Sequence, residues 1–223
     1  MVPPITSVES ARENLKEARK NRDPGTATTF KAIMLARACF DLGEFTTHKA
    51  TKADLAKEGI AAAEAALIDS PDSAHALFYL GMNHGQLART KTLGALGEVK
   101  HIESNLLKGI EADSTFQNAC NHLYLAILYK NAPGWPASIG SRTKARNHFE
   151  SAVQLAPDYP YNRIRLIEAL IDWKKIEAAR LEWKVFDRLL PKLRKKYKSE
   201  DWKPVWETWD PRIKDIEKRL KED

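Results

Sequence analysis

A spacing of small and large apolar residues recurs along this sequence and restricts its fold more than any other feature. In one segment Ala145 is followed four positions later by Phe149, then by Ala152 and, five positions further on, by Pro157. Two earlier segments repeat these offsets at intervals of 43 residues, and one later segment follows after 34: Gly59, Ala63, Ala66 and Pro71; Ile102, Leu106, Gly109 and Ser114; Ala179, Trp183, Phe186 and Pro191. Recurrence at this interval predicts a stack of similar structural units, each burying one face against its neighbours.

Each unit is expected to contain two helices, because a second apolar marker precedes the spacing described above. Leu80, Leu123 and Leu166 occupy equivalent places and are themselves 43 residues apart. From this marker to the following copy the distance is 22 residues in the first two cases and 13 in the last. We therefore predict the same nine-residue insertion between the helices of two units.

A period of 34 residues built from paired helices, with small residues where the helices cross and a proline after the second helix, resembles the tetratricopeptide repeat. Small residues such as Gly81 and Ala145 let helices approach closely, and larger side chains fill the remaining gap. The resemblance implies an all-α fold, a tetratricopeptide-like helical-hairpin solenoid with enlarged loops inside two repeats. We expect a single domain over residues 1–223. Its repeat-like units should lie near residues 26–71, 73–114, 115–157 and 159–191, followed by capping helices over 192–223.

The periodicity of apolar residues also predicts the individual helices. They are expected near residues 7–21, 26–42, 50–69, 73–89, 95–112, 115–130, 142–156, 160–173, 175–196 and 200–221. Ser73 and Thr115 are the expected N-caps of two of them. Trp202, Trp206 and Trp209 share one face of the last helix. We interpret this face as a cap over the end of the stack, with an aromatic ligand platform as the alternative.

Charge and motif content indicate which functions to expect. The net charge of +6 comes from 36 basic and 30 acidic residues that are interspersed, and only the run KLRKKYK, residues 192–198, concentrates it. We expect this run to be a solvated helix face and expect no nucleic-acid partner, with RNA binding as the alternative. Cys39 and Cys120 are predicted to be small core residues. The histidines and cysteines form no metal-binding spacing, and no phosphate loop or nucleophile motif occurs, so we predict no enzyme activity, no metal and no cofactor.

The N-terminal segment MVPPITSVES lacks the basic-then-apolar pattern of a secretory leader. No stretch approaches the roughly 18 consecutive apolar residues that a membrane span requires. We expect a soluble chain that is periplasmic if a leader has been removed and cytoplasmic otherwise.

The two insertions are the most promising places for function, because both join a first helix to a second helix and should emerge on the same edge of the stack. The first follows a helix end that carries four polar candidates for binding: Asn83, Gln86, Arg89 and Lys91. The second, APGWPASIGSRTK, contains Trp135 and Ser138 as candidates. Gly140 and Ser141 are expected to offer free backbone amides to an anion at the start of the next helix. The alternative is that the loop packs Trp135 against its neighbour and caps a helix.

A groove on the concave side of the stack is a second candidate site. Helical geometry predicts that the first helices line it and that four of its residues contact a ligand or partner: Phe78, Met82, Asn121 and Leu125. These side chains are apolar with scattered amides, so an apolar small molecule or a partner helix fits better than a carboxylate held by a basic row. His84 and His122 lie near this groove and are interpreted as hydrogen-bonded helix residues.

Three segments in order, YLGMNHGQLARTK, LLKGIEADSTF and NAPGWPASIGSRTKARNHFESAVQLAPDYPYNR, resemble the T-component family of tripartite ATP-independent periplasmic transporters over residues 74–170. The resemblance implies a bacterial, periplasmic helical-repeat protein that oligomerises and associates with the substrate-binding protein of a transporter. It also implies an apolar organic-acid ligand. Our leading hypothesis is therefore a non-enzymatic binding protein of this kind. The alternative is a general interaction scaffold that binds an amphipathic helix or peptide.

Overall fold

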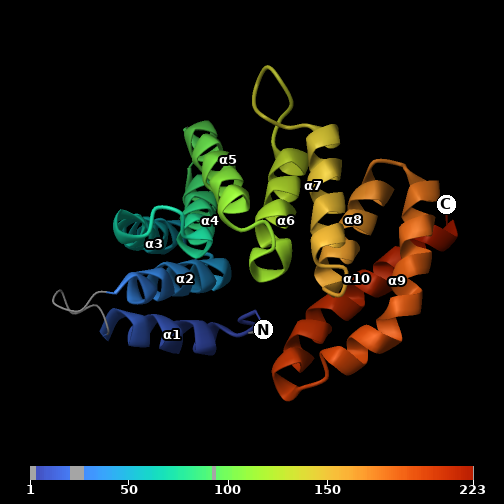
Figure 1. Cartoon of the computed structure of the whole chain (residues 1–223), viewed down its shortest axis with the longest axis horizontal. Helices are drawn as coiled ribbons and strands as arrows, with labels where there is room; N and C mark the ends of the chain where they lie inside the picture. Colours follow the sequence, from blue (N-terminus) through green and yellow to red (C-terminus); the bar gives the residue numbers. More distant parts are fainter. Residues whose placement is uncertain (1–3, 21–27, 92–93, 223) are drawn as a thin grey trace. The chain divides into compact units, whose positions relative to one another are not determined.

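The computed structural model describes residues 4–20, 28–91 and 94–222, which form ten α-helices and one short 3-10 turn at Glu200–Trp202 (Figure 1). The helices are α1 Val8–Lys20, α2 Thr29–Phe45, α3 Lys49–Asp69, α4 Ala74–Thr90, α5 Ala95–Ala112, α6 Phe116–Asn131, α7 Arg142–Leu155, α8 Pro160–Asp172, α9 Ile176–Lys196 and α10 Lys203–Glu222. The described residues contain no β-strand, so the predicted all-α class is confirmed. No helix in these ranges is long and apolar enough to cross a membrane.

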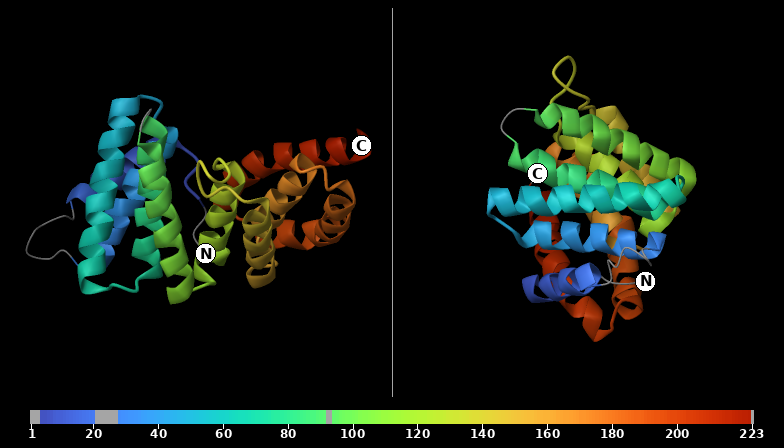
Figure 2. Two further views of the ribbon diagram at one scale, coloured as in Figure 1. Left: turned by 90° about the horizontal axis from the view of Figure 1, so that it is seen from above. Right: turned by 90° about the vertical axis from the view of Figure 1, so that its left-hand side faces the viewer.

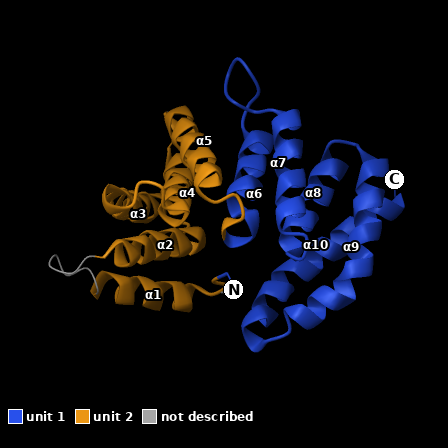
Figure 3. Cartoon of the chain, viewed as in Figure 1, with its two compact units in different colours: residues 1–4, 117–223 blue, residues 5–116 orange. Residues whose placement is uncertain are grey.

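The chain divides into two compact units (Figure 3). The N-terminal unit comprises residues 5–116, and the C-terminal unit comprises residues 117–223 together with the first four residues. The division lies close to the predicted boundary between the repeats near 73–114 and 115–157. The prediction of a single domain stays a prediction.

In the N-terminal unit, antiparallel helical hairpins follow one another as the repeat pattern predicts. Helix α1 packs on α2, α2 pairs with α3, α3 contacts α4, and α4 pairs with α5. Helix α4 also touches α2, which is the first helix of the preceding hairpin. Figure 2 shows these helices lying side by side. This arrangement places the C-terminal ends of α2 and α4 close together.

The C-terminal unit has one continuous apolar core to which α6, α7, α8, α9 and α10 all contribute. Helix α8 packs against α7, α9 and α10. The three tryptophans near the end of the chain, Trp202, Trp206 and Trp209, are buried in this core. The indole Nε1 of Trp206 donates a hydrogen bond of 2.8 Å to the carbonyl of Tyr197. The tryptophan face is therefore buried within its own unit, and the alternative of an open ligand platform is wrong. The role of this face as a cap over the stack stays a prediction.

The first three residues of each copy of the recurring spacing are core residues, except Trp183, which is half-buried, and the fourth residues are not buried. Leu80, Leu123 and Leu166 are all buried, as are the small and large residues that cross between helices: Gly59, Ala63, Ala66, Ile102, Leu106, Gly109, Ala145, Phe149, Ala152, Ala179 and Phe186. Gly59 shows why a small residue is needed. A Cβ atom there would lie 2.3 Å from the side-chain oxygen of Asn83 on α4. The interpretation that small residues permit close helix approach is confirmed.

Of the two predicted N-caps, only Ser73 has that role. Its hydroxyl accepts a hydrogen bond of 3.2 Å from the amide of Ala76 at the start of α4. The expected cap at Thr115 is wrong, because its amide and hydroxyl both donate to Asp113 Oδ1, at 2.9 and 2.8 Å. The carboxylate of Asp113 therefore holds Thr115 in a turn and not at the N-cap of a helix. The next residues, Gln117–Ala119, have positive φ angles, so the first turn assigned to α6 is left-handed.

Several smaller expectations are also settled. Cys39 and Cys120 are both buried, as predicted for small core residues. The basic run at 192–198 lies at the end of α9 and the turn that follows it. Within the run Arg194 pairs with Asp210 at 2.5 Å and lies over the Trp206 ring. Part of the positive charge of the run is therefore neutralised on the surface of its own unit.

Candidate functional site

The second insertion forms an ordered loop, residues 132–141, between α6 and α7, and it extends beyond the ends of both helices (Figure 1, yellow). Backbone hydrogen bonds close the loop at its base. The amide of Gly140 donates to the carbonyl of Pro133 at 2.8 Å, and the amide of Ser141 donates to that of Tyr129 at 2.9 Å. The amides of Ala137 and Ser138 both donate to Gly134, at 3.1 and 3.2 Å. Main-chain contacts therefore hold the loop in one conformation without help from large side chains.

Gly140 makes this closure possible. A Cβ atom at this position would lie 2.1 Å from the carbonyl oxygen of Ala132 and 2.7 Å from that of Pro133. No side chain fits at such distances, so the two sides of the loop approach each other only because residue 140 is glycine. Gly134, on the opposite side of the loop, is less restricted, since its nearest neighbour would be 3.8 Å away.

Trp135 lies in the turn that Gly134 closes with Ala137 and Ser138, and it is 89% exposed, more than any other large apolar side chain of the described residues. It is followed by Pro136 through a cis peptide bond. The alternative that the loop packs this indole against its neighbour is therefore wrong. Tryptophan is among the residue types that contribute most to protein interfaces, because it buries a large area at a small cost in side-chain entropy. An exposed indole on an ordered loop has the form of an interface anchor.

Positive charge adjoins the loop on the first two turns of α7. Arg142, Lys144 and Arg146 are all exposed there. The ammonium group of Lys144 lies 4.9 Å from the centre of the Tyr129 ring, and Arg146 pairs with Glu150 at 2.7 Å. Arg142 is the first residue of α7 and directly follows the loop in sequence. Lys144 and Arg146 add positive charge further along the helix.

The expected anion site at Gly140 and Ser141 is not available. The amide of Gly140 donates to Pro133 of the loop and that of Ser141 donates to Tyr129 of α6. The Ser141 hydroxyl accepts from the amide of Lys144 at 3.3 Å as the N-cap of α7. The backbone donors that would have bound an anion are therefore already used. The alternative that this part of the loop caps a helix is confirmed.

Two histidines join α6 to α7 beneath the loop. Nδ1 of His122 lies 3.0 Å from Nδ1 of His148, and the His148 ring stacks on Tyr129 with their centres 5.6 Å apart. Burial, with smaller contributions from His122 and Lys144, lowers the pKa of His148 to about 4. Burial also lowers the pKa of His122. Near neutral pH both rings are uncharged and one donates to the other, which agrees with the interpretation of His122 as a hydrogen-bonded helix residue.

The four polar candidates beside the first insertion do not form an open binding surface. Asn83 is buried, and its amide nitrogen donates to the carbonyls of Ala36 and Tyr79 at 2.9 and 2.8 Å. Gln86 is buried as well and donates to Glu44.

Arg89 also donates to Glu44, at 2.6 Å. Glu44 is the hydrogen-bond acceptor for both Gln86 and Arg89. Its role was not recognised from the sequence, because it lies in the preceding hairpin. Asn83, Gln86 and Arg89 join α4 to α2. The expectation that they contact a partner is corrected for Asn83 and Gln86, because both are buried.

Lys91 takes part in a second network, around a carboxylate that sequence reasoning missed. Its ammonium group pairs with Glu98, whose other oxygen lies 2.6 Å from Nδ1 of His84. Burial disfavours the charged carboxylate, but the hydrogen bonds from Lys91 and His84 outweigh it and hold the pKa of Glu98 below its ordinary value. The network links the end of α4 to the start of α5 across the first insertion. Residues 92 and 93 of that insertion lie outside the described residues.

The four residues predicted to line a concave groove do not present open surfaces. Phe78, Met82, Asn121 and Leu125 are all buried, and the Phe78 ring contacts Tyr79 at 5.1 Å between centres. A ligand or partner helix would reach these side chains only if the surrounding helices moved. The expectation that they line an open surface is therefore corrected, since apolar side chains on a first helix are covered by its neighbours. The further prediction that the two insertions share one edge stays a prediction.

Within the described ranges, no group of three or more histidine, cysteine or acidic side chains is placed to hold a metal ion. The loop at 132–141 and the basic residues on α7 are thus the most accessible ordered features among the predicted sites.

No family model and no curated protein matches this sequence. Several solved structures, including the following two, are similar to it in fold. The crystal structure of MamA shares 18% sequence identity over 86% of this chain and 90% of its own, with a TM-score of 0.53. TTC0263, a thermophilic TPR protein from Thermus thermophilus, shares 16% identity over 84% of this chain and 97% of its own, with a TM-score of 0.52.

The chain has a tetratricopeptide-repeat fold. In this tetratricopeptide-like solenoid the loop at 132–141 is an enlarged connection inside one hairpin, between α6 and α7. Connections of this kind can lengthen without disturbing the stacked core, which explains how the fold accommodates an insertion there.

Proposed function

We propose that this protein is a non-enzymatic helical-repeat protein that binds a partner protein through the loop at 132–141, with Trp135 as the main contact. The observation that carries the proposal is the 89% exposure of Trp135 on a loop whose conformation is set by its own backbone hydrogen bonds. A preformed loop loses little conformational entropy when it binds, so more of the interaction energy appears as affinity.

The size of the effect can be estimated. A tryptophan that becomes buried removes about 200 Å² from water, which at roughly 25 cal/mol per Å² corresponds to ~5 kcal/mol before the costs of association. Interface anchors of this type commonly contribute about 2 kcal/mol or more when measured by truncation to alanine. Trp135 alone is therefore able to decide whether a complex of moderate affinity forms.

The charges around the loop indicate what kind of partner fits. Arg142, Lys144 and Arg146 are exposed on the first two turns of α7, which follow the loop directly in sequence, and Glu150 pairs with Arg146. Complementary charge speeds association and selects partners. We infer a partner protein with an apolar pocket for the indole and with carboxylates at the rim of that pocket.

A more specific form of the proposal is that the protein is the T component of a tripartite ATP-independent periplasmic transporter and that its partner is the substrate-binding protein. The sequence resemblance over residues 74–170 supports this form, and the resemblance includes the loop. The protein would then be located in the periplasm and act as an oligomer. An apolar organic-acid ligand is less well supported, because the apolar side chains proposed to contact it are buried.

The alternative of a scaffold that binds an amphipathic helix in its groove is also less well supported. Phe78, Met82 and Leu125 would have to provide that groove, and all three are buried.

The test compares the Trp135→Ala variant with wild-type protein in affinity capture from the native organism, with bound proteins quantified by mass spectrometry. A matched control is Leu181→Ala, which removes another exposed apolar side chain, 69% exposed on α9. We expect Trp135→Ala to lose specific partners by a factor of about 10 or more, which corresponds to the anchor contribution estimated above. The control should keep them, and both variants should retain the wild-type circular dichroism spectrum and melting temperature.

If the two variants lose the same proteins equally, or if Trp135→Ala loses none, the loop is not the binding site. Recovery of a substrate-binding protein among the specific partners, together with impaired uptake on deletion of the gene, would support the transporter form. Partners unrelated to transport would instead favour the general scaffold.

A further inference from the structure

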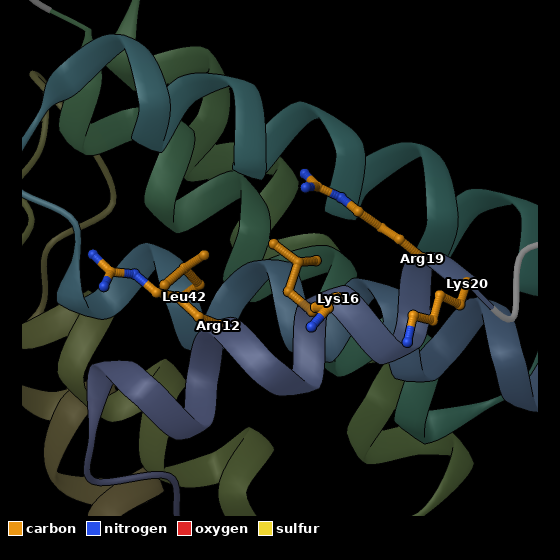
Figure 4. Close-up of a pocket in the computed structure, with 6 residues that line it drawn as sticks. Arg12, Lys16, Arg19, Lys20 and Leu42 are labelled. Atoms are coloured by element: carbon orange, nitrogen blue, oxygen red, sulfur yellow. The ribbon is translucent and has the colours of Figure 1, made fainter.

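A second surface, in the unit that does not carry the Trp135 loop, is lined by basic side chains. It is a hollow of about 500 Å³ in the N-terminal unit, formed by α1 and by Leu42 of α2 (Figure 4). Leu15 also contributes to its lining, which otherwise consists of four cationic residues on α1: Arg12, Lys16, Arg19 and Lys20. No acidic side chain contributes to this lining among the residues that the structure describes.

Leu15 contributes little accessible surface to the hollow. Leu15 is only 3% exposed, since its side chain packs into the core between α1 and α2. What a bound molecule would touch is therefore Leu42 together with the aliphatic stems and charged ends of the lysines and arginines. Such stems cover apolar groups while their charged ends remain in water. The hollow thus combines a small apolar contact with a surrounding set of positive charges.

Three of the four cations are available to a ligand. Arg19 is held by Glu58 of α3 through two hydrogen bonds, at 3.0 and 2.6 Å, and forms a fixed wall. Lys16 and Lys20 only approach Glu13 and Glu17, at 3.6 and 3.8 Å, and all four of these side chains are well exposed.

Exposed pairs of this kind contribute little and exchange partners easily. Arg12, also exposed, has no hydrogen bond or ion pair with any other described residue.

We propose that this hollow binds an acidic segment of a partner protein, in which carboxylates flank one apolar side chain. The proposal rests on the proposed function and names a second contact for a partner. An arginine and two lysines can pair with two or more carboxylates, and the apolar residue between them would lie on Leu42. A volume of about 500 Å³ accommodates a few residues of extended peptide. A long acyl chain is a poorer match, because Leu15 is buried and Leu42 is the main apolar side chain left for it to contact.

The experiment measures binding of a defined probe to the full chain. The probe is a short peptide of alternating glutamate and leucine, blocked at both ends and labelled with an uncharged dye. Its control replaces every glutamate by glutamine. The test variant is Arg12→Gln/Lys16→Gln/Lys20→Gln, and the matched variant is Lys57→Gln/Lys100→Gln/Lys108→Gln, which removes the same charge from exposed positions on α3 and α5. Circular dichroism melting checks that each variant is folded.

We expect the triple variant on α1 to bind the glutamate peptide about 10-fold more weakly than wild type, and the matched variant to bind within about 2-fold. The glutamine peptide should bind weakly to all of them. Raising the salt concentration should weaken wild-type binding, because the contacts are exposed ion pairs. Arg12→Lys, which keeps the charge, should bind nearly as wild type and guards against a folding defect in the triple variant.

Equal loss in both triple variants would mean diffuse attraction to a basic protein and would overturn the proposal. Binding of octanoate at α1 without binding of the peptide would overturn it in favour of a small amphiphilic carboxylate. Trp135→Ala should bind the probe as wild type does. Failure of the peptide experiment therefore leaves the loop proposal untouched, and failure of the loop proposal does not change the result with the peptide.

Discussion

At the scale of single residues, close contacts between backbone and polar side chains decide where substitution is tolerated. Asn83 fills the space that Gly59 leaves and uses its amide nitrogen on two carbonyl groups, those of Ala36 and Tyr79. One side chain thereby joins α4 to both helices of the preceding hairpin. A glycine in the middle of a helix lowers its intrinsic stability, so its presence in α3 reflects this packing requirement.

We predict that Gly59→Ala lowers the free energy of unfolding by about 2–3 kcal/mol, because the new methyl group displaces Asn83 from its buried hydrogen bonds. In a chain of this length the melting temperature should fall by roughly 5–10 °C. Gly97→Ala in α5 is the matched control, since a Cβ atom there meets nothing within 4 Å. It should leave stability unchanged or raise it slightly. Equal melting temperatures for the two variants would contradict the packing argument.

His148 should make the protein less stable in acid. Burial lowers the pKa of His148 to about 4, below the ordinary 6.5 that applies when the chain is unfolded. As the pH falls from 6.5 towards 4, the unfolded chain takes up a proton at this residue and the folded chain does not. Unfolding is therefore favoured by roughly 1 kcal/mol, once solvent screening at this half-buried site is included. His148→Gln should remove that part of the pH dependence in denaturant titrations at pH 7 and pH 5.

Asp41 should make stability depend on pH in the direction opposite to His148. Burial raises the pKa of Asp41 from 3.8 to about 6 despite the nearby Arg37, so the folded chain takes up this proton first as the pH falls. Its contribution to stability therefore decreases as the pH rises from about 4 to 6. Asp41→Asn should change the slope of stability against pH in the direction opposite to His148→Gln. Identical slopes in the two variants would show that neither group is responsible.

At the scale of structural elements, the helices follow the sequence pattern closely and the connections follow it less well. Helix α5 was predicted at 95–112 and spans Ala95–Ala112. Helix α6 was predicted near 115–130 and begins at Phe116, but the left-handed conformation of Gln117–Ala119 was not predicted, because no glycine signals it. Apolar periodicity determines where a helix has a buried face, whereas a turn depends on particular hydrogen bonds such as those from Thr115 to Asp113.

For the loop at 132–141, the importance of its backbone conformation can be tested separately from that of the Trp135 side chain. Gly140→Ala keeps Trp135 but forces the two sides of the loop apart, so it should weaken partner capture by about as much as Trp135→Ala while leaving the helical spectrum intact. Limited proteolysis should cut the altered loop faster. Gly134→Ala is the matched control, because the space next to it is ordinary. If Gly140→Ala binds partners normally, the fixed loop conformation is not needed for binding.

At the scale of the whole molecule, the two compact units have separate cores, and damage to one should stay within it. Trp209 is buried among aromatic rings of the C-terminal unit, including Tyr159 and Tyr161. We predict that Trp209→Ala destabilises that unit by about 3–5 kcal/mol. Hydrogen exchange should then lose protection over residues 117–222 and keep it over the helices of the N-terminal unit. Loss of protection along the entire chain would show that the units unfold together.

The sequence alone determined the helical hairpins, their approximate bounds and the residues of the core, because the spacing of apolar residues at the helical period is a local property that identifies the buried face. Only the tertiary structure decided what the polar and aromatic candidates do. Gln86 looked like a binding residue and proved to be buried against Glu44, which is 42 residues away. Trp135 looked as suited to packing as to binding and proved to be exposed. A side chain's partner depends on which helices and loops come together across distant parts of the chain, and local periodicity does not contain that information.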